Sequence, residues 1–568
     1  MHISTACEQA RAIQADSDKP LIVGALASLG SNGKFASNQE RDMRNWLRDF
    51  TNVNLEVYDC YITMEIHGIV QKELMPMMLI HEVFAECMKA GMERIFYTDF
   101  RDVGEYWAEM MQSEYGRNHS SVADAEKCDF LQWTIPLVLH HDDVEAFKEV
   151  PFTCFNFSSP LVSGDPWLRK LAIFCLETNH MVEFTTYAEL SAIMIWSLKW
   201  VALGRYPPAG FYGEQWPVGS RRRKLAGTPL CRQWRAAFVG MKSDLKAEHE
   251  LHGFQRYYLC KLICKGCFAT KIPEGHILTY KNLRPNALHR LTRVSHEDYL
   301  RDTPPHKRSP WVAHPDWTID RNLGDNLHLL FVGGVAKDMV GVALMEVALV
   351  ERFWQTPELQ TNAQQLRAAW KEFRQWAKQR QHGVASVWVF TEKAWLSQGY
   401  PMVPNRVKAA AAQYLLLWMA EIVITIAGLP TAGHRQMLRK NCFTGLVSYM
   451  QVQHLSGKCF LSVDECRQCQ AHGVLFLESY TELALLPPAA ENLIWHCRPK
   501  LHYLSHQILE LHWTRENPHS YQCRMEEDFC GKLAAIISKC HRATASRSAL
   551  LRYTYGILTR WFQEKHPS

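Results

Sequence analysis

Hydrophobic positions along this chain follow two spacings, and the change from one to the other marks its segments. Residues 133–140 form a short apolar run of the kind found in buried strands, and it comes just before Asp142 and Asp143. Residues 152–157 alternate between inward and outward positions and stop before Pro160. The two runs predict adjacent strands, with acidic residues at the end of the first.

Helical spacing predominates elsewhere. Residues 80–96 place apolar side chains three and four positions apart, so the first part of the chain is expected to be mostly helical. Residues 188–203 predict a further helix. Residues 366–377 predict an amphipathic helix and residues 409–427 a more buried one, both inside a helical block that spans roughly residues 350–495.

The length of the chain bears on how these segments are grouped. At 568 residues the chain is too long for one hydrophobic core, so several domains are expected. We expect an N-terminal helical region, an α/β segment with a C-x-x-C sequence, a helical insertion and a C-terminal helical segment, with the bounds 1–128, 129–348, 349–498 and 499–568.

Composition narrows the class of protein. Hydrophobic residues make up 47% and charged residues 21%, which excludes a disordered or fibrous chain. The formal net charge is +5, a mild excess that permits a nucleic-acid partner without requiring one. The 26 histidines make metal or phosphate chemistry worth testing, although surface and structural histidines are the ordinary case.

Cysteine usage and the apolar stretches indicate where the protein works. The 18 cysteines are scattered and no secretory signal precedes them, so we expect reduced thiols and an intracellular protein. The longest apolar stretch, residues 409–429, contains Glu421, which favours a buried helix over a membrane span. No membrane partner is therefore expected.

Four acidic residues stand at boundaries between apolar and polar sequence. They are Asp142, Asp244, Asp325 (which begins Asp-Asn-Leu-His and so precedes His328) and Glu527. Metal-dependent phosphoryl transfer needs carboxylates that converge, because together they hold two divalent cations beside the attacking and leaving oxygens. Hard oxygen ligands suit Mg²⁺ or Mn²⁺.

The order of these segments resembles that of CACTA (En/Spm-like) and Plavaka-like DNA transposases. The resemblance runs unevenly from about residue 133 to the C-terminus. It is carried by residues 135–142, 238–258 and 264–267, by residues 325–328 with 334 and 337–338, and by residues 499–502 and 527–533. It implies an α/β fold with a ribonuclease-H-like core, an N-terminal helical region and a large all-α insertion.

The resemblance also implies a site and a function. Asp142, Asp244 and Glu527 would be the catalytic acids that bind Mg²⁺ or Mn²⁺, and His328 would lie near them. Asp143 and Glu526 are alternative acids beside the first and the last. The implied activity is cleavage and transfer of DNA strands in the nucleus, with DNA as the partner and a homo-oligomer as a candidate state.

Cys264 and Cys267 form the C-x-x-C sequence and could supply half of a zinc site. His276 and His289 are candidate partners, and buried free thiols are the alternative. A second C-x-x-C, at Cys466 and Cys469, lies far along the chain inside the helical block.

A histidine pair near the C-terminus is a separate candidate. His502 and His506 are spaced i,i+4 and would share one helix face, where they could bind metal. We expect a packed, solvated pair here, because the sequence marks no third ligand nearby.

Two basic stretches are expected to contact phosphates. They are residues 221–224 and the tail from Arg542 to Arg560. Two rival functions remain. One is a transposase-derived DNA-binding protein without catalysis, and the other is a helical scaffold that binds proteins.

Overall fold

Two units, each assembled from separated stretches of sequence, make up the chain. Unit 1 comprises residues 1–104, 124–238 and 525–568, and unit 2 comprises residues 105–123 and 239–524. This computed structural model describes residues 3–16, 24–32, 34–35, 38–125, 130–272 and 277–565.

Unit 1 combines strands with helices from both ends of the chain. Its strands are β1 (Val57–Ile66), β2 (Ile69–Met78), β3 (Thr134–Phe147), β4 (Val150–Ser158), β5 (Leu171–Glu177) and the start of β6 (Arg235–Ser243). Its helices are α1 (Ile3–Ala15), α2 (Gly24–Asn32), α3 (Gln39–Thr51), α4 (Ile80–Lys89), the start of α5 (Arg101–Met110), α8 (Pro166–Arg169), α9 (Thr185–Leu203), α10 (Arg221–Leu225), α21 (Arg524–Ile537) and α22 (Ala545–Lys565).

Unit 2 is mostly helical. It contains the end of β6, the strand β7 (Asn322–Gly324), and the helices α6 (Glu114–Asn118), α7 (Ser120–Ala125), α11 (Leu245–His252), α12 (His296–Asp302), α13 (Asn326–Leu330), α14 (Val335–Met345), α15 (Asn362–Gln379), α16 (Glu392–Trp395), α17 (Ala409–Ala427), α18 (His434–Ser456), α19 (Val463–Leu485) and α20 (Pro499–Thr514).

A mixed five-stranded sheet runs in the order β5-β4-β3-β6-β7. The pairs β3/β4 and β4/β5 are antiparallel, whereas β6 and β7 are parallel. The strands expected around residues 133–140 and 152–157 are confirmed as β3 and β4. The expectation that the first strand ends at Asp142 is wrong, because Asp142 pairs with Cys154 and β3 continues to Phe147. The apolar Val144 and Ala146 extend the alternation past the two acids.

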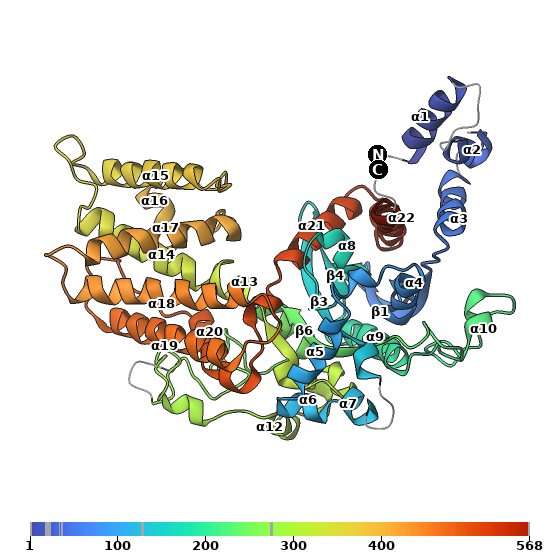
Figure 1. Cartoon of the computed structure of the whole chain (residues 1–568), viewed down its shortest axis with the longest axis horizontal. Helices are drawn as coiled ribbons and strands as arrows, with labels where there is room; N and C mark the ends of the chain where they lie inside the picture. Colours follow the sequence, from blue (N-terminus) through green and yellow to red (C-terminus); the bar gives the residue numbers. More distant parts are fainter. Residues whose placement is uncertain are drawn as a thin grey trace. The chain divides into compact units, whose positions relative to one another are not determined.

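Helices cover both faces of the sheet in unit 1. On one face, His141 of β3 packs against Phe155 and against Tyr187 of α9. On the other face, the Asn156 side chain of β4 approaches Cys530 of α21, with 3.8 Å between Nδ2 and Sγ. Figure 1 shows α21 beside β3 and β4. Neighbouring residues of β3 point to opposite faces, so each belongs to one of these two environments.

The N-terminal region, which is expected from the sequence to be helical, also contains a β-hairpin. Strands β1 and β2 pair antiparallel from Val57 with Met78 to Ile66 with Ile69. His67 and Gly68 form the two-residue turn, with φ of 53° and 78°. Positive φ at both central residues is the geometry that favours a tight hairpin. In the sequence, the alternation of apolar and polar residues along β1 and the His-Gly pair that follows it indicate this hairpin.

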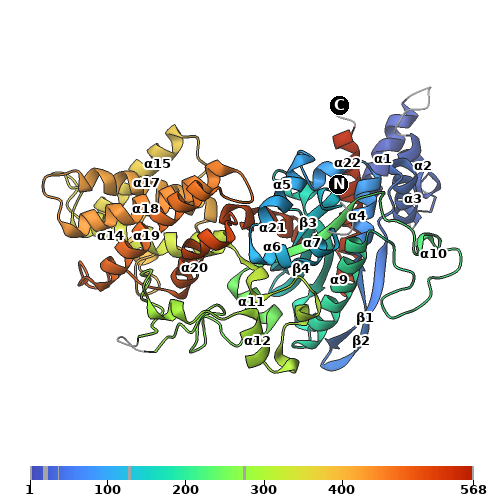
Figure 2. The same ribbon diagram turned by 60° about the horizontal axis from the view of Figure 1, so that its bottom comes forward.

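The core of unit 2 lies among its long helices. Helices α17, α18 and α19 lie side by side (Figure 1, Figure 2). Their core includes the buried Trp395, Trp418, Phe443 and Phe476, and it takes in α13 and α14, upstream of residue 349. The buried helix expected around residues 409–427 is α17.

Two helical segments are long and apolar enough to cross a membrane by length and composition. These are Asn326–Val350, with 83% of its most apolar window buried, and α17, with 56% buried. Both contribute to the core of unit 2. Glu421 of α17 accepts a hydrogen bond from the Trp376 indole at 2.9 Å. Burial inside the fold accounts for most of the apolar composition of Asn326–Val350.

Candidate metal centres

The C-x-x-C sequence forms a tight loop in unit 2. The Ile263 N–H donates to the Ala269 carbonyl at 3.0 Å and closes the loop, while the Gly266 N–H points at the Cys264 sulfur at 3.4 Å. A small separate cluster of buried residues surrounds the loop: Ile263, Cys264, Cys267 and Ala269, with Tyr280 and Tyr503 packed against them. The two sulfurs are thus held on one side of a short turn.

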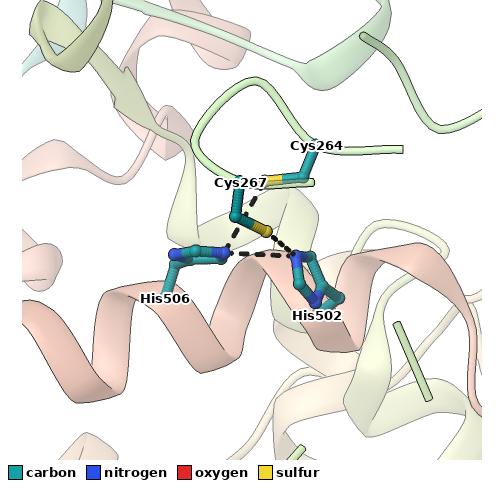
Figure 3. Close-up of side chains that lie close together, drawn as sticks. All are labelled: Cys264, Cys267, His502 and His506. Atoms are coloured by element: carbon teal, nitrogen blue, oxygen red, sulfur yellow. Dashed lines mark hydrogen bonds between the residues drawn. The ribbon is translucent and has the colours of Figure 1, made fainter. Parts of the chain in front are cut away.

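The histidine pair lies on α20. Pro499 occupies the first turn of this helix, where its missing N–H costs no hydrogen bond. The i,i+4 spacing places His502 and His506 on one face. The Tyr503 hydroxyl donates to the Ile263 carbonyl and ties the helix to the cysteine loop. Cys264, Cys267, His502 and His506 therefore face one another (Figure 3).

The distances among these four residues fit a tetrahedral zinc ion. Sγ of Cys264 lies 3.6 Å from Nε2 of His506, and Sγ of Cys267 lies 3.3 Å from Nε2 of His502. The two Nε2 atoms are 3.1 Å apart. In a tetrahedral site, zinc–sulfur bonds are about 2.3 Å and zinc–nitrogen bonds about 2.0 Å long. These lengths place sulfur and nitrogen roughly 3.6 Å apart, and the two nitrogens roughly 3.3 Å apart. The four residues can hold Zn²⁺ after small adjustments.

Glu510 completes the surroundings of this group. Its carboxylate lies 2.9 Å from Nδ1 of His506, the ring nitrogen that points away from the sulfurs. A carboxylate in that place fixes the orientation of a metal-binding imidazole. Although burial opposes it, Cys264 and Glu510 raise the pKa of His506 to about 10.

In the sequence, the cysteine pair and the histidine pair are two separate candidates, and no local pattern indicates that they meet. The expectation of a packed, solvated pair at His502 and His506 is wrong in one respect, because Cys264 and Cys267 lie against it. His289 packs on the His502 ring, with ring centroids 4.8 Å apart, outside the four residues. His276 lies outside the described residues.

The second C-x-x-C takes part in the helical core instead. Cys466 and Cys469 are buried on α19, where their sulfurs approach backbone carbonyl groups of the helical core. They behave as small apolar side chains.

Two acids in unit 2 stand at the carboxyl ends of neighbouring parallel strands. Ser243 ends β6 and is paired with Gly324, which ends β7. Asp244 and Asp325 follow directly, and each caps the next helix: Asp244 accepts from the Ala247 N–H at 2.7 Å and Asp325 from the Leu327 N–H at 2.8 Å. The carboxyl edge of parallel strands is the usual place for ligands in α/β sheets.

Asp325 is the more constrained of the two acids. It is 3% exposed, accepts from the Cys523 N–H at 3.0 Å and contacts Nδ1 of His328. Although burial opposes it, these contacts hold the pKa of Asp325 below its usual value. Asp325 caps the short helix α13, which joins it to His328.

A half-buried lysine at the start of α20 lies close to these acids. Lys500 donates to the carbonyls of His328 and Val332, at 3.1 and 2.7 Å. Burial and the nearby Arg498 lower the pKa of Lys500 to about 8, whereas Asp244 and Asp325 act in the opposite direction. The charges of both acids therefore reach the same ammonium group. We name Asp244, Asp325 and His328 the acidic edge.

Asp142 and Asp143 lie on opposite faces of the sheet in unit 1. Asp143 accepts a hydrogen bond from Thr153 at 2.7 Å, on the face that carries His141 and α9. Asp142 lies on the other face, which carries α21. Both acids are half-buried.

Glu526 and Glu527 of α21 also differ in their surroundings. Glu526 is 1% exposed and accepts from Lys170 at 2.6 Å, whereas Glu527 is half-buried. Burial, and then the charges of Asp142, Glu526 and Glu527, raise the pKa of Cys530 well above its usual value. Within unit 1, the charges of Asp142 and Glu527 therefore both raise the pKa of the Cys530 thiol.

The basic stretches are partly neutralised inside unit 1. Arg221 pairs with Glu86, and Arg222 pairs with Glu82 through two hydrogen bonds of 2.6 and 2.9 Å. In the tail, Arg542 pairs with Glu177 and Arg547 with Asp59. These four guanidinium groups already have carboxylate partners. Residues 221–224 lie in the short helix α10.

No protein-family model matches the chain, and no curated protein matches it.

Proposed function

We propose that this chain cleaves and joins DNA strands in a reaction that depends on divalent cations, as a transposase of the CACTA type. The acidic edge is the observation that carries the proposal. Asp244 and Asp325 come from adjacent parallel strands and both charges reach Lys500. Carboxylates grouped at such an edge are suitable ligands for Mg²⁺ or Mn²⁺.

The order of elements supports a ribonuclease-H-like core. Three consecutive antiparallel strands, β3, β4 and β5, are followed by the long helix α9 and then by β6 and β7, with β3 central in the sheet. The helical block follows, and α21 with Glu527 comes after it. This is the arrangement that the resemblance to these transposases implies.

By the resemblance, Asp142, Asp244 and Glu527 would each be a ligand for Mg²⁺ or Mn²⁺, which would supply charge stabilisation for phosphoryl transfer. Asp142 is preferred to Asp143 because it lies on the face of β3 that carries α21. Glu527 is preferred to Glu526 because the Glu526 carboxylate is paired with Lys170. Asp325 orients the His328 ring through its contact with Nδ1.

A zinc ion held by Cys264, Cys267, His502 and His506 would have a structural role. The group supplies four ligands, which leaves no open position for a substrate. Both of its halves also support the acidic edge. Lys265 donates to the Asn322 carbonyl at 3.1 Å, and Gln507 of α20 donates to the Gly324 carbonyl at 2.9 Å. We name Cys264, Cys267, His502 and His506 the zinc group. The zinc group would thus hold β7, and Asp325 that follows it, in place.

The decisive experiment measures Mn²⁺- or Mg²⁺-dependent nicking of supercoiled DNA by the purified protein. Asp244→Asn keeps an oxygen that caps α11 but removes the charge, so folding is expected to be unchanged. We expect nicking to fall at least about 100-fold in Asp244→Asn and in Asp142→Asn, because each loses a metal-binding carboxylate.

Asp143→Asn is the matched control, since it changes the neighbouring acid on the other face of β3. We expect its nicking to stay within a few-fold of the unchanged protein. Equal loss in Asp142→Asn and Asp143→Asn would refute the assignment. No nicking by the unchanged protein, with DNA still bound, would favour the DNA-binding descendant. Absence of DNA binding would favour the protein-binding scaffold.

A further inference from the structure

The helical part of unit 2 has a cavity that the proposed chemistry does not use. It has a volume of about 570 Å³, within the range of ligand sites, and lies between α15 and the chain that leads to α17. Its lining includes Trp370, Arg374, Val387, Trp388, Thr391 and Arg406. We name it the Trp-Arg groove. Figure 1 shows α15 and α16 in the yellow part of the chain.

Aromatic rings with arginines above them are the main feature of this groove. The Arg406 guanidinium carbon lies 4.4 Å from the centre of the Trp388 ring, and that of Arg374 lies 5.9 Å from Trp370. Trp388 is 64% exposed, although an indole of this size is ordinarily buried. Arg406 covers part of the ring, and the rest is accessible to a flat ligand.

The surroundings of the groove are strongly basic. Residues 362–408 contain eight lysines and arginines against two acidic residues, whereas the whole chain carries a net charge of +5. All eight cations are exposed. Of these eight, all within the described part of the chain, only Arg380 has a carboxylate partner, Glu421. The charge points to a polyanion as the occupant.

We propose that the Trp-Arg groove binds single-stranded nucleic acid, with an unpaired base stacked on Trp388 and with Arg374 and Arg406 contacting phosphates. Exposed aromatic rings in a basic groove are the elements that hold single strands, because every base offers a flat face. Bases of a duplex already stack on one another, so the accessible ring favours the unpaired form. Binding of a single strand at this groove is separate from strand cleavage, since it requires none of the catalytic acids.

The test measures binding of a fluorescently labelled 20-nucleotide single strand by anisotropy, without divalent cations, so that cleavage plays no part. We expect Trp388→Ala to weaken binding about 5- to 100-fold, the effect of losing one stacked base. We expect Arg406→Gln to weaken it about 3- to 10-fold and to reduce the dependence of affinity on salt. Thermal unfolding of each variant checks that the fold is kept.

Trp513→Ala is the matched control. Trp513 is 55% exposed and has Arg293 over its ring at 5.2 Å, but it lies on α20, outside the groove. Its affinity should not change. Equal loss in Trp388→Ala and Trp513→Ala, or no loss in Trp388→Ala, would overturn the proposal. Displacement of the strand by a poly-glutamate peptide at equal concentration would also overturn it, in favour of an acidic protein partner.

These outcomes are independent of the cleavage assay. Loss of nicking in Asp244→Asn with normal binding of the single strand would support both proposals. Normal nicking together with unchanged binding in Trp388→Ala would refute only the groove.

Discussion

The zinc group and the acidic edge lie in the same unit, yet they present opposite chemistry. In the zinc group, two sulfurs and two imidazoles face inward at 3.1–3.6 Å, and each half is fixed by its own hydrogen bonds. In the acidic edge, Asp244 is half-buried and both acids follow the ends of strands. A closed set of soft ligands suits a structural ion, whereas hard carboxylates at a sheet edge suit exchangeable cations.

The two regions should differ in how much their folding depends on a metal ion. The cluster around the cysteine loop has only a few apolar residues of its own, so little hydrophobic burial holds the loop on α20. A zinc ion would supply the missing stabilisation, since structural zinc contributes directly to folding. The two acids of the acidic edge directly follow β6 and β7, whose pairing helps to hold them in place.

The largest expected effect follows from removing a zinc ligand. We expect Cys267→Ser to lose bound zinc and to destabilise unit 2 by more than about 4 kcal/mol, the scale of losing a structural metal. Elemental analysis of the purified protein measures the zinc content, and thermal unfolding measures the stability.

Cys260→Ser is the control, because Cys260 is close in sequence to the loop but outside the four-residue group. It should keep about one zinc per chain. A zinc content near zero in the unchanged protein, purified without chelator, would contradict the assignment.

A smaller effect should distinguish the two glutamates of α21. Glu526 is buried and ion-paired, whereas Glu527 is half-buried. Glu526→Gln leaves Lys170 buried without its charge partner and should destabilise the protein by about 3–5 kcal/mol. Glu527→Gln should change the free energy of unfolding by less than about 1 kcal/mol and abolish nicking. Urea unfolding and the nicking assay, run on both variants, compare them. Similar stability of the two variants would show that the Lys170 pair contributes little.

Local patterns in the sequence predict the elements of this fold better than its sites. The apolar runs at residues 133–140 and 152–157 correctly predict β3 and β4, and the apolar stretch at residues 409–427 correctly predicts a buried helix. The hairpin of β1 and β2 has an equally local signal, an alternation with a His-Gly turn, and could have been found.

The candidate sites depend on contacts between residues far apart in the chain, which no local pattern contains. The C-x-x-C and the i,i+4 histidine pair are separate signals, and only the packing of the cysteine loop on α20 joins them. The choice between Asp142 and Asp143 needs the register of β3, because one residue of shift exchanges the two faces of the sheet. The pairing of Glu526 with Lys170 is likewise a contact between distant residues.

The smallest expected effect tests whether the carboxylate beside the zinc group acts through the metal. Glu510 contacts Nδ1 of His506, so Glu510→Gln should weaken zinc affinity about 10- to 100-fold without removing a ligand. Competition with a chelator measures that affinity. Nicking at saturating zinc should be unchanged, because the acidic edge keeps its carboxylates. Glu250→Gln, an exposed change on α11, is the control and should leave the affinity unaltered. If Glu510→Gln instead lowered nicking at full zinc occupancy, the two regions would be coupled more closely than separate structural and catalytic roles require.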